Sequence, residues 1–175
     1  MHIKKMAETT PAEIYSRVFD QPVGEWGSPP LSELIRLYPL GVELSPGSND
    51  FNLRSPLAVE PDGSFLMNAP VPEGQIAHIL VGDPDACLEA VRILTRHAIR
   101  DLGSAEPLLA LAFVDSAWHL LLKNRLGKLC EALQDELGDI PFIGGYTSGQ
   151  IFRSSPEVAP QHFTHHCLMV LLGRS

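Results

Sequence analysis

Three glycines lie among polar residues in the segment Gly144–Gln150, whose sequence is Gly-Gly-Tyr-Thr-Ser-Gly-Gln. Glycine allows a close backbone approach or a positive φ angle, and Thr147 and Ser148 place hydroxyl groups beside it. Tyr146 and Gln150 add a phenol and an amide, so the segment has the chemistry to cradle a small ligand. The same glycines also suit a β-bulge or tight packing where a strand crosses a sheet, which needs no ligand.

Familiar catalytic and phosphate-binding motifs do not describe this segment. No lysine follows as in GxxxxGK[ST], and a strand pattern follows where a GxGxxG turn would open a helix. Ser148 lacks the Gly-x-Ser-x-Gly frame of a nucleophile elbow. We therefore expect neither phosphate binding nor acyl transfer at this segment.

A second polar group stands where the apolar run Leu108–Val114 passes into a helical pattern. Asp115, Ser116 and His119 follow that run, at a place where side chains often face a pocket. These residue types match a catalytic triad, but Asp115 and Ser116 also match the capping residues of a helix. We favour the cap, expect no enzymatic activity, and retain Ser116 and His119 as candidate ligand contacts.

Arginine and histidine supply the remaining candidates. Arg54 interrupts an apolar strand pattern, and an arginine inside a cleft is a good carboxylate receptor, although it can equally point to solvent. His162, His165 and His166 lie close together, and imidazole binds zinc or haem iron. Their spacing matches no standard zinc signature, and adjacent residues of a strand beginning near His165 would point to opposite faces. We expect no metal or cofactor, with His165 and His166 kept as haem candidates.

Composition limits the class of protein. The 175 residues, 45% of them hydrophobic, suffice for one domain with its own core. A net charge of −8 would repel a phosphate backbone, so nucleic acid is not an expected partner. The apolar runs fall short of the roughly 20 residues that cross a bilayer, and no apolar stretch follows the amino-terminal lysines. We expect a cytoplasmic protein without membrane contact, and three unpaired cysteines.

Helices are predicted by caps and apolar spacing. After a flexible segment at residues 1–10, Thr10-Pro11-Ala12-Glu13 has the form of a capping box and predicts a helix to about Phe19. A short helix is expected between Leu31 and Tyr38. Asp83-Pro84 caps a helix that runs to about Leu102. The spacing from Trp118 to Leu137 predicts one long helix, which Gly138 ends.

Strands are predicted between these helices. They are expected at Val42–Leu44, Leu53–Val59, Phe65–Met67, Gln75–Val81, Leu108–Val114, Phe142–Ile151 and His166–Leu172. Pro61–Ser64 has the composition of a hairpin turn, and a polar loop is expected at residues 153–161. Leu108–Val114 is nearly continuously apolar, which predicts a central strand covered on both faces. The fold class is therefore α+β: a mixed, mostly antiparallel β-sheet flanked by helices, in a single domain at residues 11–175.

Several segments occur together in the order typical of a known family. They are Tyr38–Val42, Leu53-Arg54, Asp62–Ser64, Val71–Gly74, Pro141–Gln150 and the closing strand from Phe163 to Leu172. In this combination the chain resembles the FIST C-terminal domain over about residues 11–173. The Gly-Tyr-Thr-x-Gly stretch followed by an aromatic-led final strand is the most specific of these features.

Members of that family are intracellular signal-transduction sensors, usually preceded by a FIST amino-terminal half, and are proposed to bind small ligands such as amino acids. The resemblance implies a small-molecule-sensing domain. The candidate ligand-binding residues are Arg54, Ser116, His119, Tyr146, Thr147, Ser148 and Gln150. Of these, Arg54, Tyr146, Thr147 and Gln150 are expected to bound the pocket. Gln150 stands where the family usually has a glutamate, which removes an ionic partner for an α-amino group.

The resemblance also leaves two alternative functions open. Some full-length relatives bind haem and report nitric oxide, so a haem-linked gas sensor that uses His165 or His166 is the first. The second is an interaction half-domain without a ligand, which pairs with a FIST amino-terminal partner, with a signalling output domain, or with itself as a homodimer.

Overall fold

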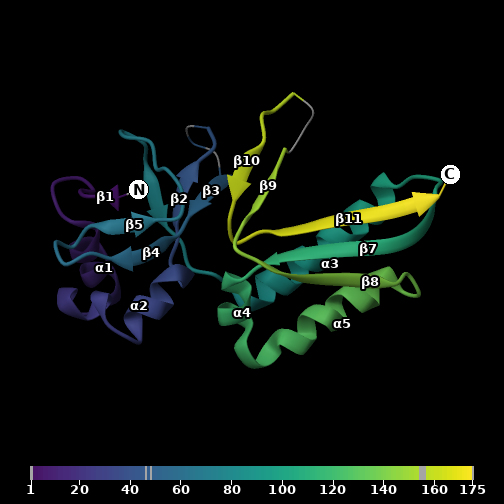
Figure 1. The fold of residues 1–175 in the computed structure, drawn as a ribbon, viewed down its shortest axis with the longest axis horizontal. Coiled ribbons are helices and arrows are strands. Elements are labelled where there is room, and N and C mark those ends of the chain that lie inside the picture. Colours follow the sequence, from purple (N-terminus) through teal and green to yellow (C-terminus); the bar gives the residue numbers. More distant parts are fainter. Residues whose placement is uncertain (1, 46, 48, 154–156, 175) are drawn as a thin grey trace. The chain divides into compact units, whose positions relative to one another are not determined.

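The computed structural model describes residues 2–45, 47, 49–153 and 157–174, and the chain divides into two compact units. Residues 1–81 form the first unit and residues 82–175 the second. Figure 1 shows their helices and strands. The predicted α+β class is confirmed. In the described part of the chain, the strands form four small sheets where we expected one sheet.

Helices of the first unit begin with α1 (Pro11–Phe19), which has the predicted capping box. The backbone N–H of Glu13 donates to Thr10 Oγ1 at 3.3 Å, and the Glu13 carboxylate accepts from the backbone N–H of Thr10 at 2.8 Å. The next elements are η1 (Val23–Gly27), α2 (Leu31–Leu34) and η2 (Ile35–Leu37). Part of the segment that we expected to be flexible is paired, because β1 (His2–Ile3) lies antiparallel to β5 (Phe65–Met67).

Strands of the first unit form sheets in the orders β1-β5-β4 and β3-β2-β6. They are β2 (Leu40–Glu43), β3 (Phe51–Arg54), β4 (Pro56–Val59), β5 (Phe65–Met67) and β6 (Ala77–Ile79). Gly63, at φ +78°, makes the predicted turn between β4 and β5. Tyr15 and Phe65 are fully buried at the centre of this unit, with ring centroids 4.8 Å apart.

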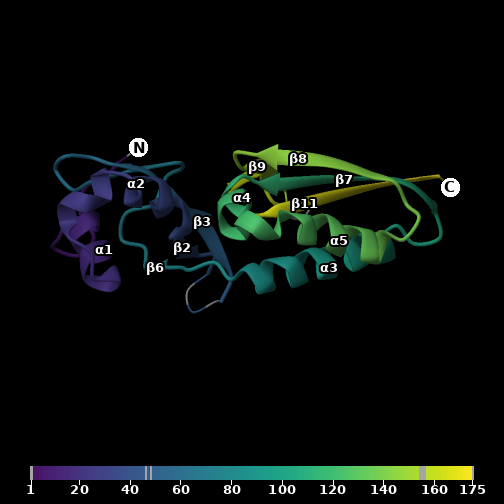
Figure 2. The same cartoon turned by 90° about the horizontal axis from the view of Figure 1, so that it is seen from below.

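The second unit is built on a sheet in the order β11-β7-β8. Its central strand β7 (Glu106–Asp115) is parallel to β8 (Phe142–Thr147) and antiparallel to β11 (Cys167–Arg174). Helices α3 (Pro84–Asp101) and α5 (Leu126–Leu137) lie on the same face of this sheet, as Figure 2 shows. The predicted central strand and the mixed strand directions are therefore confirmed.

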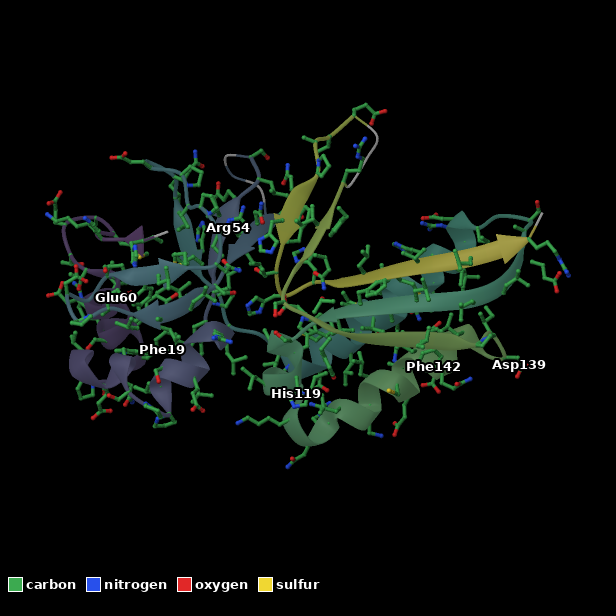
Figure 3. All side chains as sticks on the ribbon, in the orientation of Figure 1. Phe19, Arg54, Glu60, His119, Asp139 and Phe142 are labelled. Atoms are coloured by element: carbon green, nitrogen blue, oxygen red, sulfur yellow. The ribbon has the colours of Figure 1, made fainter. Side chains whose placement is uncertain are left out.

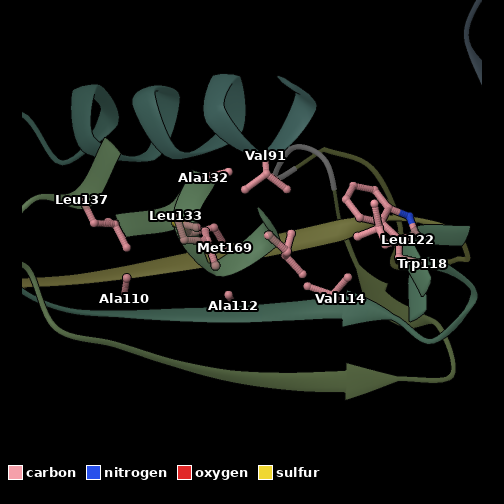
Figure 4. Packing of buried hydrophobic residues seen from close by; sticks show 11 residues of the cluster. Val91, Ala110, Ala112, Val114, Trp118, Leu122, Ala132, Leu133, Leu137 and Met169 are labelled. Atoms are coloured by element: carbon pink, nitrogen blue, oxygen red, sulfur yellow. The ribbon is translucent and has the colours of Figure 1, made fainter. Parts of the chain in front are cut away.

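The two faces of this sheet differ in their cover. Ala110, Ala112 and Val114 point toward the helices and are buried with Leu133 and Met169 (Figure 4). On the opposite face, side chains remain exposed, such as those of Ile143, Val170 and Leu172. We expected both faces of β7 to be covered, but the helices α3 and α5 cover one face.

Three predicted elements are interrupted. The strand expected over Leu53–Val59 is divided into β3 and β4, which lie in different sheets. The helix expected from Trp118 to Leu137 is divided into α4 (Ala117–Leu122), η3 (Lys123–Arg125) and α5, because Lys123 has a φ of +43°. The strand expected over Phe142–Ile151 ends at Thr147. There Gly149, at φ +89°, turns the chain into β9 (Gln150–Phe152), which pairs with β10 (Gln161–Phe163). Of the loop expected at residues 153–161, residues 154–156 lie outside the described residues.

Candidate functional site

Three strand ends meet at one edge of the sheet in the second unit. Because β7 and β8 are parallel, their carboxyl ends lie side by side, and the antiparallel strand β11 begins there. The backbone N–H of Ser116 donates to the carbonyl of Thr147 at 2.8 Å, and that of Asp115 donates to the carbonyl of His166 at 3.0 Å. The carboxyl ends of parallel strands are a common position for ligand sites.

Most of the predicted site residues lie at this sheet end. They are Ser116, His119, Tyr146, Thr147, Ser148, Gln150, His165 and His166. Arg54 belongs to β3 of the first unit, and Figure 3 labels it together with His119 of α4. The expected pocket that joins Arg54 to Tyr146 therefore stays a prediction.

Gln150 ties the strand ends together from a buried position. Its Nε2 donates to Thr147 Oγ1 at 2.8 Å and lies 3.3 Å from the carbonyl oxygen of His166 and 3.4 Å from that of Phe113. Its Oε1 is buried and has no hydrogen-bond partner among the described residues. Because the carbonyls of Phe113 and His166 can only accept, exchanging the nitrogen and oxygen would make both of these contacts unfavourable.

The polar residues at the start of α4 act mainly as a cap. The Asp115 side chain is buried and accepts a hydrogen bond from the backbone N–H of Ala117 at 2.8 Å. Ser116 occupies the N-cap position, and its side chain makes no capping hydrogen bond. The predicted cap is confirmed, with Asp115 as the side chain that makes it.

His119 and Tyr146 form an aromatic pair behind β8. Their ring centroids are 5.3 Å apart and the rings are nearly perpendicular, the edge-to-face arrangement favoured by aromatic quadrupoles. Tyr146 pairs with Val114 in the sheet, so the side chains of Tyr146 and Val114 lie on the same face, which carries the helices. Burial, and to a smaller extent the coulombic effect of Cys130, raises the pKa of the Tyr146 hydroxyl.

A hollow of about 230 Å³ lies beside this ring, between β8 and α5. We call it the Tyr146 hollow. Its walls are formed by Ala112, Val114, Leu129, Cys130, Leu133, Phe142, Ile143, Gly144, Gly145 and Tyr146. The side-chain hydroxyl of Tyr146 and the thiol of Cys130 are the polar side-chain groups in this lining, which contains no Asp, Glu, Lys, Arg or His.

The glycines of the Gly144–Gln150 segment have different roles. A Cβ on Gly144 would overlap the carbonyl oxygen of Ala112, so this glycine lets β8 approach β7 closely. A Cβ on Gly145 would meet nothing within 4 Å. Gly149 has the positive φ that the turn into β9 requires. Close approach and positive φ are thus both present, as the sequence predicted.

A comparison with known families shows to which family the chain belongs. A sequence profile of the FIST C domain matches residues 11–153. The chain belongs to the FIST C domain family. Neither the curated proteins nor the solved structures include a match to it.

The FIST C family consists of signal-transduction sensory domains, and this chain is one of them. The resemblance noted in the sequence is confirmed, although the matched range ends at residue 153 and we expected it to reach about residue 173. The matched range includes β7, α5, β8 and the turn at Gly149. It therefore contains the whole lining of the Tyr146 hollow on this FIST C domain.

The histidine candidates of the FIST C domain are engaged in backbone contacts. His165 has a φ of +58° and its carbonyl accepts from the Trp118 indole at 2.9 Å. His166 Nδ1 lies 2.6 Å from the Thr164 carbonyl. Both residues precede β11, so the condition under which adjacent strand residues would point to opposite faces, a strand beginning near His165, is not met. The described residues contain no group of three or more His, Cys, Asp or Glu side chains arranged for a metal ion.

Arg54 has a structural setting in the first unit. Its Nε donates to the Pro70 carbonyl at 2.9 Å, and one terminal nitrogen donates to Asn52 Oδ1 at 2.5 Å and to the Leu53 carbonyl at 3.0 Å. Burial lowers the pKa of the Arg54 guanidinium. These contacts connect β3 to the segment that precedes Val71.

Sequence reasoning missed the α5 wall of the hollow. Leu129, Cys130 and Leu133 follow the apolar spacing of a helix, which indicates a core position and not a binding surface. Cys130 is nevertheless exposed, unlike its neighbour Leu129. An exposed cysteine beside an apolar stripe was the available signal.

Within the described residues, no helix has the length and apolar character to span a membrane.

Proposed function

We propose that this FIST C domain senses a small molecule that binds, without covalent chemistry, in the Tyr146 hollow. The observation that supports this most is the hollow itself, which opens beside the glycine segment singled out from the sequence. Ligand pockets are typically concave and apolar with a few polar groups that fix orientation. The phenol of Tyr146 and the thiol of Cys130 provide such groups.

The lining favours an uncharged guest. A zwitterionic amino acid needs partners for its carboxylate and ammonium groups, and burying either charge without a partner is costly. We therefore propose a small apolar or aromatic molecule with one hydrogen-bonding group, in place of the amino acid implied by the family. A cavity of about 150 Å³ holds benzene. The hollow of about 230 Å³ has room for one or two fused rings.

Thermal shift measurements test this proposal directly. Indole, p-cresol, phenylalanine and glutamate serve as probes at millimolar concentration, and we expect the melting temperature to rise with indole or p-cresol. A ligand at 100 times its Kd stabilises the folded state by about 2.7 kcal/mol, which is readily measured. If neither aromatic probe raises the melting temperature, the binding proposal is abandoned.

A matched pair of variants locates the site. Cys130→Phe places a ring in the hollow and should abolish the response to the aromatic probes. Gln134→Phe adds the same ring on an exposed position of α5 outside the lining and should leave the response unchanged. An unchanged response in a folded Cys130→Phe protein would move the site elsewhere.

The other candidate functions remain predictions. Haem binding through His165 or His166 would produce a Soret band after haem is added, and His166→Ala or His165→Ala would remove it. Pairing with a FIST amino-terminal domain or a signalling output domain would appear as a larger species when the two are mixed. A cytoplasmic location is likewise an expectation from the sequence.

A further inference from the structure

Strand β8 is an edge strand without the usual protection. The sheet order β11-β7-β8 leaves one side of β8 unpaired in the described structure. Proteins commonly protect such edges with charges, prolines or bulges. The opposite edge, β11, has a register shift at Leu172/Gly173 and ends in Arg174. The β8 sequence Phe-Ile-Gly-Gly-Tyr-Thr contains no charge and no proline, and its pairing with β7 has no register shift.

The free side of β8 presents a regular row of backbone groups. Ala110 N–H donates to the Pro141 carbonyl at 2.9 Å, and Ser116 N–H donates to the Thr147 carbonyl at 2.8 Å. In a strand, the backbone groups of successive residues point to alternate sides. Residues 141, 143, 145 and 147 therefore face β7, and the N–H and C=O groups of Phe142, Gly144 and Tyr146 face the free side.

We propose that β8 pairs antiparallel with β8 of a second copy of this chain, with Gly145 opposite its counterpart. For the ladder to form, a residue whose backbone groups face the free side of β8 must lie opposite a partner residue whose backbone groups do the same. This register satisfies that condition, because Gly144 lies opposite the partner's Tyr146 and Tyr146 opposite the partner's Gly144. The two sheets then become one continuous six-stranded sheet.

The character of β8 favours a copy of itself as the occupant. Although the chain has a net charge of −8, the strand carries no charge, so two copies meet here without like-charge repulsion along the ladder. An aromatic residue opposite a glycine is a recognised stabilising cross-strand arrangement. Space for it exists on the helix face, where the Tyr146 hollow of about 230 Å³ borders Gly144 and Gly145.

The neighbouring symmetric register is less suitable. If Gly144 were opposite the partner's Gly144, glycine would face glycine on the helix side and no side chain would close the Tyr146 hollow from the open edge. In the proposed register, the partner's Tyr146 lies at that edge. The pairing needs no ligand, so it holds or fails independently of the proposed function.

Sedimentation velocity and crosslinking of the full chain, without any ligand, test the pairing. We expect a concentration-dependent dimer with a micromolar Kd, as for interfaces below about 1,200 Å². Gly145 tolerates substitution because its Cβ meets nothing. Directly opposite residues of such a non-hydrogen-bonded pair have Cα atoms about 4.5 Å apart, within disulfide range. Gly145→Cys, in a Cys130→Ser background, should therefore form a linked dimer on oxidation.

Controls use a second unobstructed glycine. Gly127 is exposed on α5 and its Cβ also meets nothing within 4 Å, so Gly127→Cys should yield at least about tenfold less linked dimer. Gly145→Lys places like charges opposite each other and should leave a folded monomer, whereas Gly127→Lys should still dimerise. A monomeric wild-type chain at 200 µM, roughly a hundred times a low-micromolar Kd, would overturn the proposal. So would a dimer that neither crosslinks through Gly145→Cys nor responds to Gly145→Lys.

Discussion

The side-chain nitrogen of Gln150 donates a hydrogen bond to Oγ1 of Thr147 at 2.8 Å, across the turn made by Gly149. The same nitrogen faces the main-chain carbonyls of Phe113 and His166. One amide thus joins the end of β8 to β7 and to the residue before β11. The conformation of the sheet end depends on this buried donor.

Gln150→Glu should destabilise the chain in a pH-dependent manner. The variant replaces a donor by a carboxylate that faces acceptor oxygens, and we expect a loss of about 2–3 kcal/mol in unfolding free energy at pH 7.5. Burial and these acceptors would raise the folded-state pKa of the new carboxyl, so the loss should shrink below the ordinary glutamate pKa, where the group is protonated in both states. Urea unfolding at pH 4 and pH 7.5 measures it. Gln150→Leu is the control, and an identical pH dependence of the two variants would contradict the prediction.

Gly144→Ala and Gly145→Ala should differ sharply although the residues are adjacent. The new methyl at Gly144 meets the carbonyl oxygen of Ala112, a backbone atom that cannot move without β7. We expect a loss of about 3 kcal/mol or more for Gly144→Ala. Gly145→Ala meets open space and should stay within about 0.5 kcal/mol of wild type. Equal losses in chemical denaturation would show that the close approach of β8 and β7 is not the cause.

The ring contact of His119 with Tyr146 should appear as a coupling energy. A double-mutant cycle with His119→Ala and Tyr146→Ala is expected to give about 0.5–1 kcal/mol, since the pair is edge-to-face and partly exposed. Thermal unfolding of the four proteins supplies the values. His97→Ala on α3 combined with Tyr146→Ala should be additive, and a coupling of zero in the His119 cycle would remove this contact from the account of the site.

The cysteines should react at very different rates. Burial raises the pKa of the Cys167 thiol to about 11, and burial together with Asp83 raises that of Cys87 to about 11, while Cys130 is exposed. Iodoacetamide at pH 8 should modify Cys130 first, with the other two at least about tenfold slower. Mass spectrometry of the digested protein follows each site. Equal rates would place Cys87 and Cys167 in solvent.

The same two thiols should make stability fall in alkali. Their folded-state pKa values of about 11 exceed the ordinary value of 9.0, so the neutral thiol is favoured by folding. This contribution is complete below pH 9 and is lost as the pH rises toward 11. Cys167→Ala should reduce the slope of unfolding free energy against pH in that range, and a slope equal to that of wild type would contradict the prediction.

Arg54→Lys should reduce stability and leave ligand binding intact. Lysine cannot reproduce the fork that contacts Pro70, Asn52 and Leu53, and we expect a loss of about 1–2 kcal/mol. The thermal response to indole or p-cresol should equal that of wild type. A lost response in a stable Arg54→Lys protein would restore this arginine to the binding site.

Local signals in the sequence predicted most elements because their causes are local. The capping box at Thr10, the Asp83 cap and Gly138 each act through hydrogen bonds or φ angles within a few residues. The break at Lys123 was missed, since apolar spacing continues through it. At Gly149 the sequence indicated a possible positive φ but not that the strand ends there. The glycines and Tyr146 identified one wall of the hollow. The other wall, on α5, could not be predicted. Which helix packs there depends on how the crossover from β7 to β8 folds onto the sheet, and this is a tertiary property.

The break at Lys123 divides the helical side of the hollow between two segments. His119, which contacts the Tyr146 ring, belongs to α4, whereas Leu129, Cys130 and Leu133 belong to α5. The turn at Lys123 separates the two helical backbones, so each segment takes its position from its own packing on the sheet. Strand β8 is held by its parallel ladder with β7. A substitution that displaces α4 should therefore change the support of the Tyr146 ring and leave the apolar wall on α5 in place.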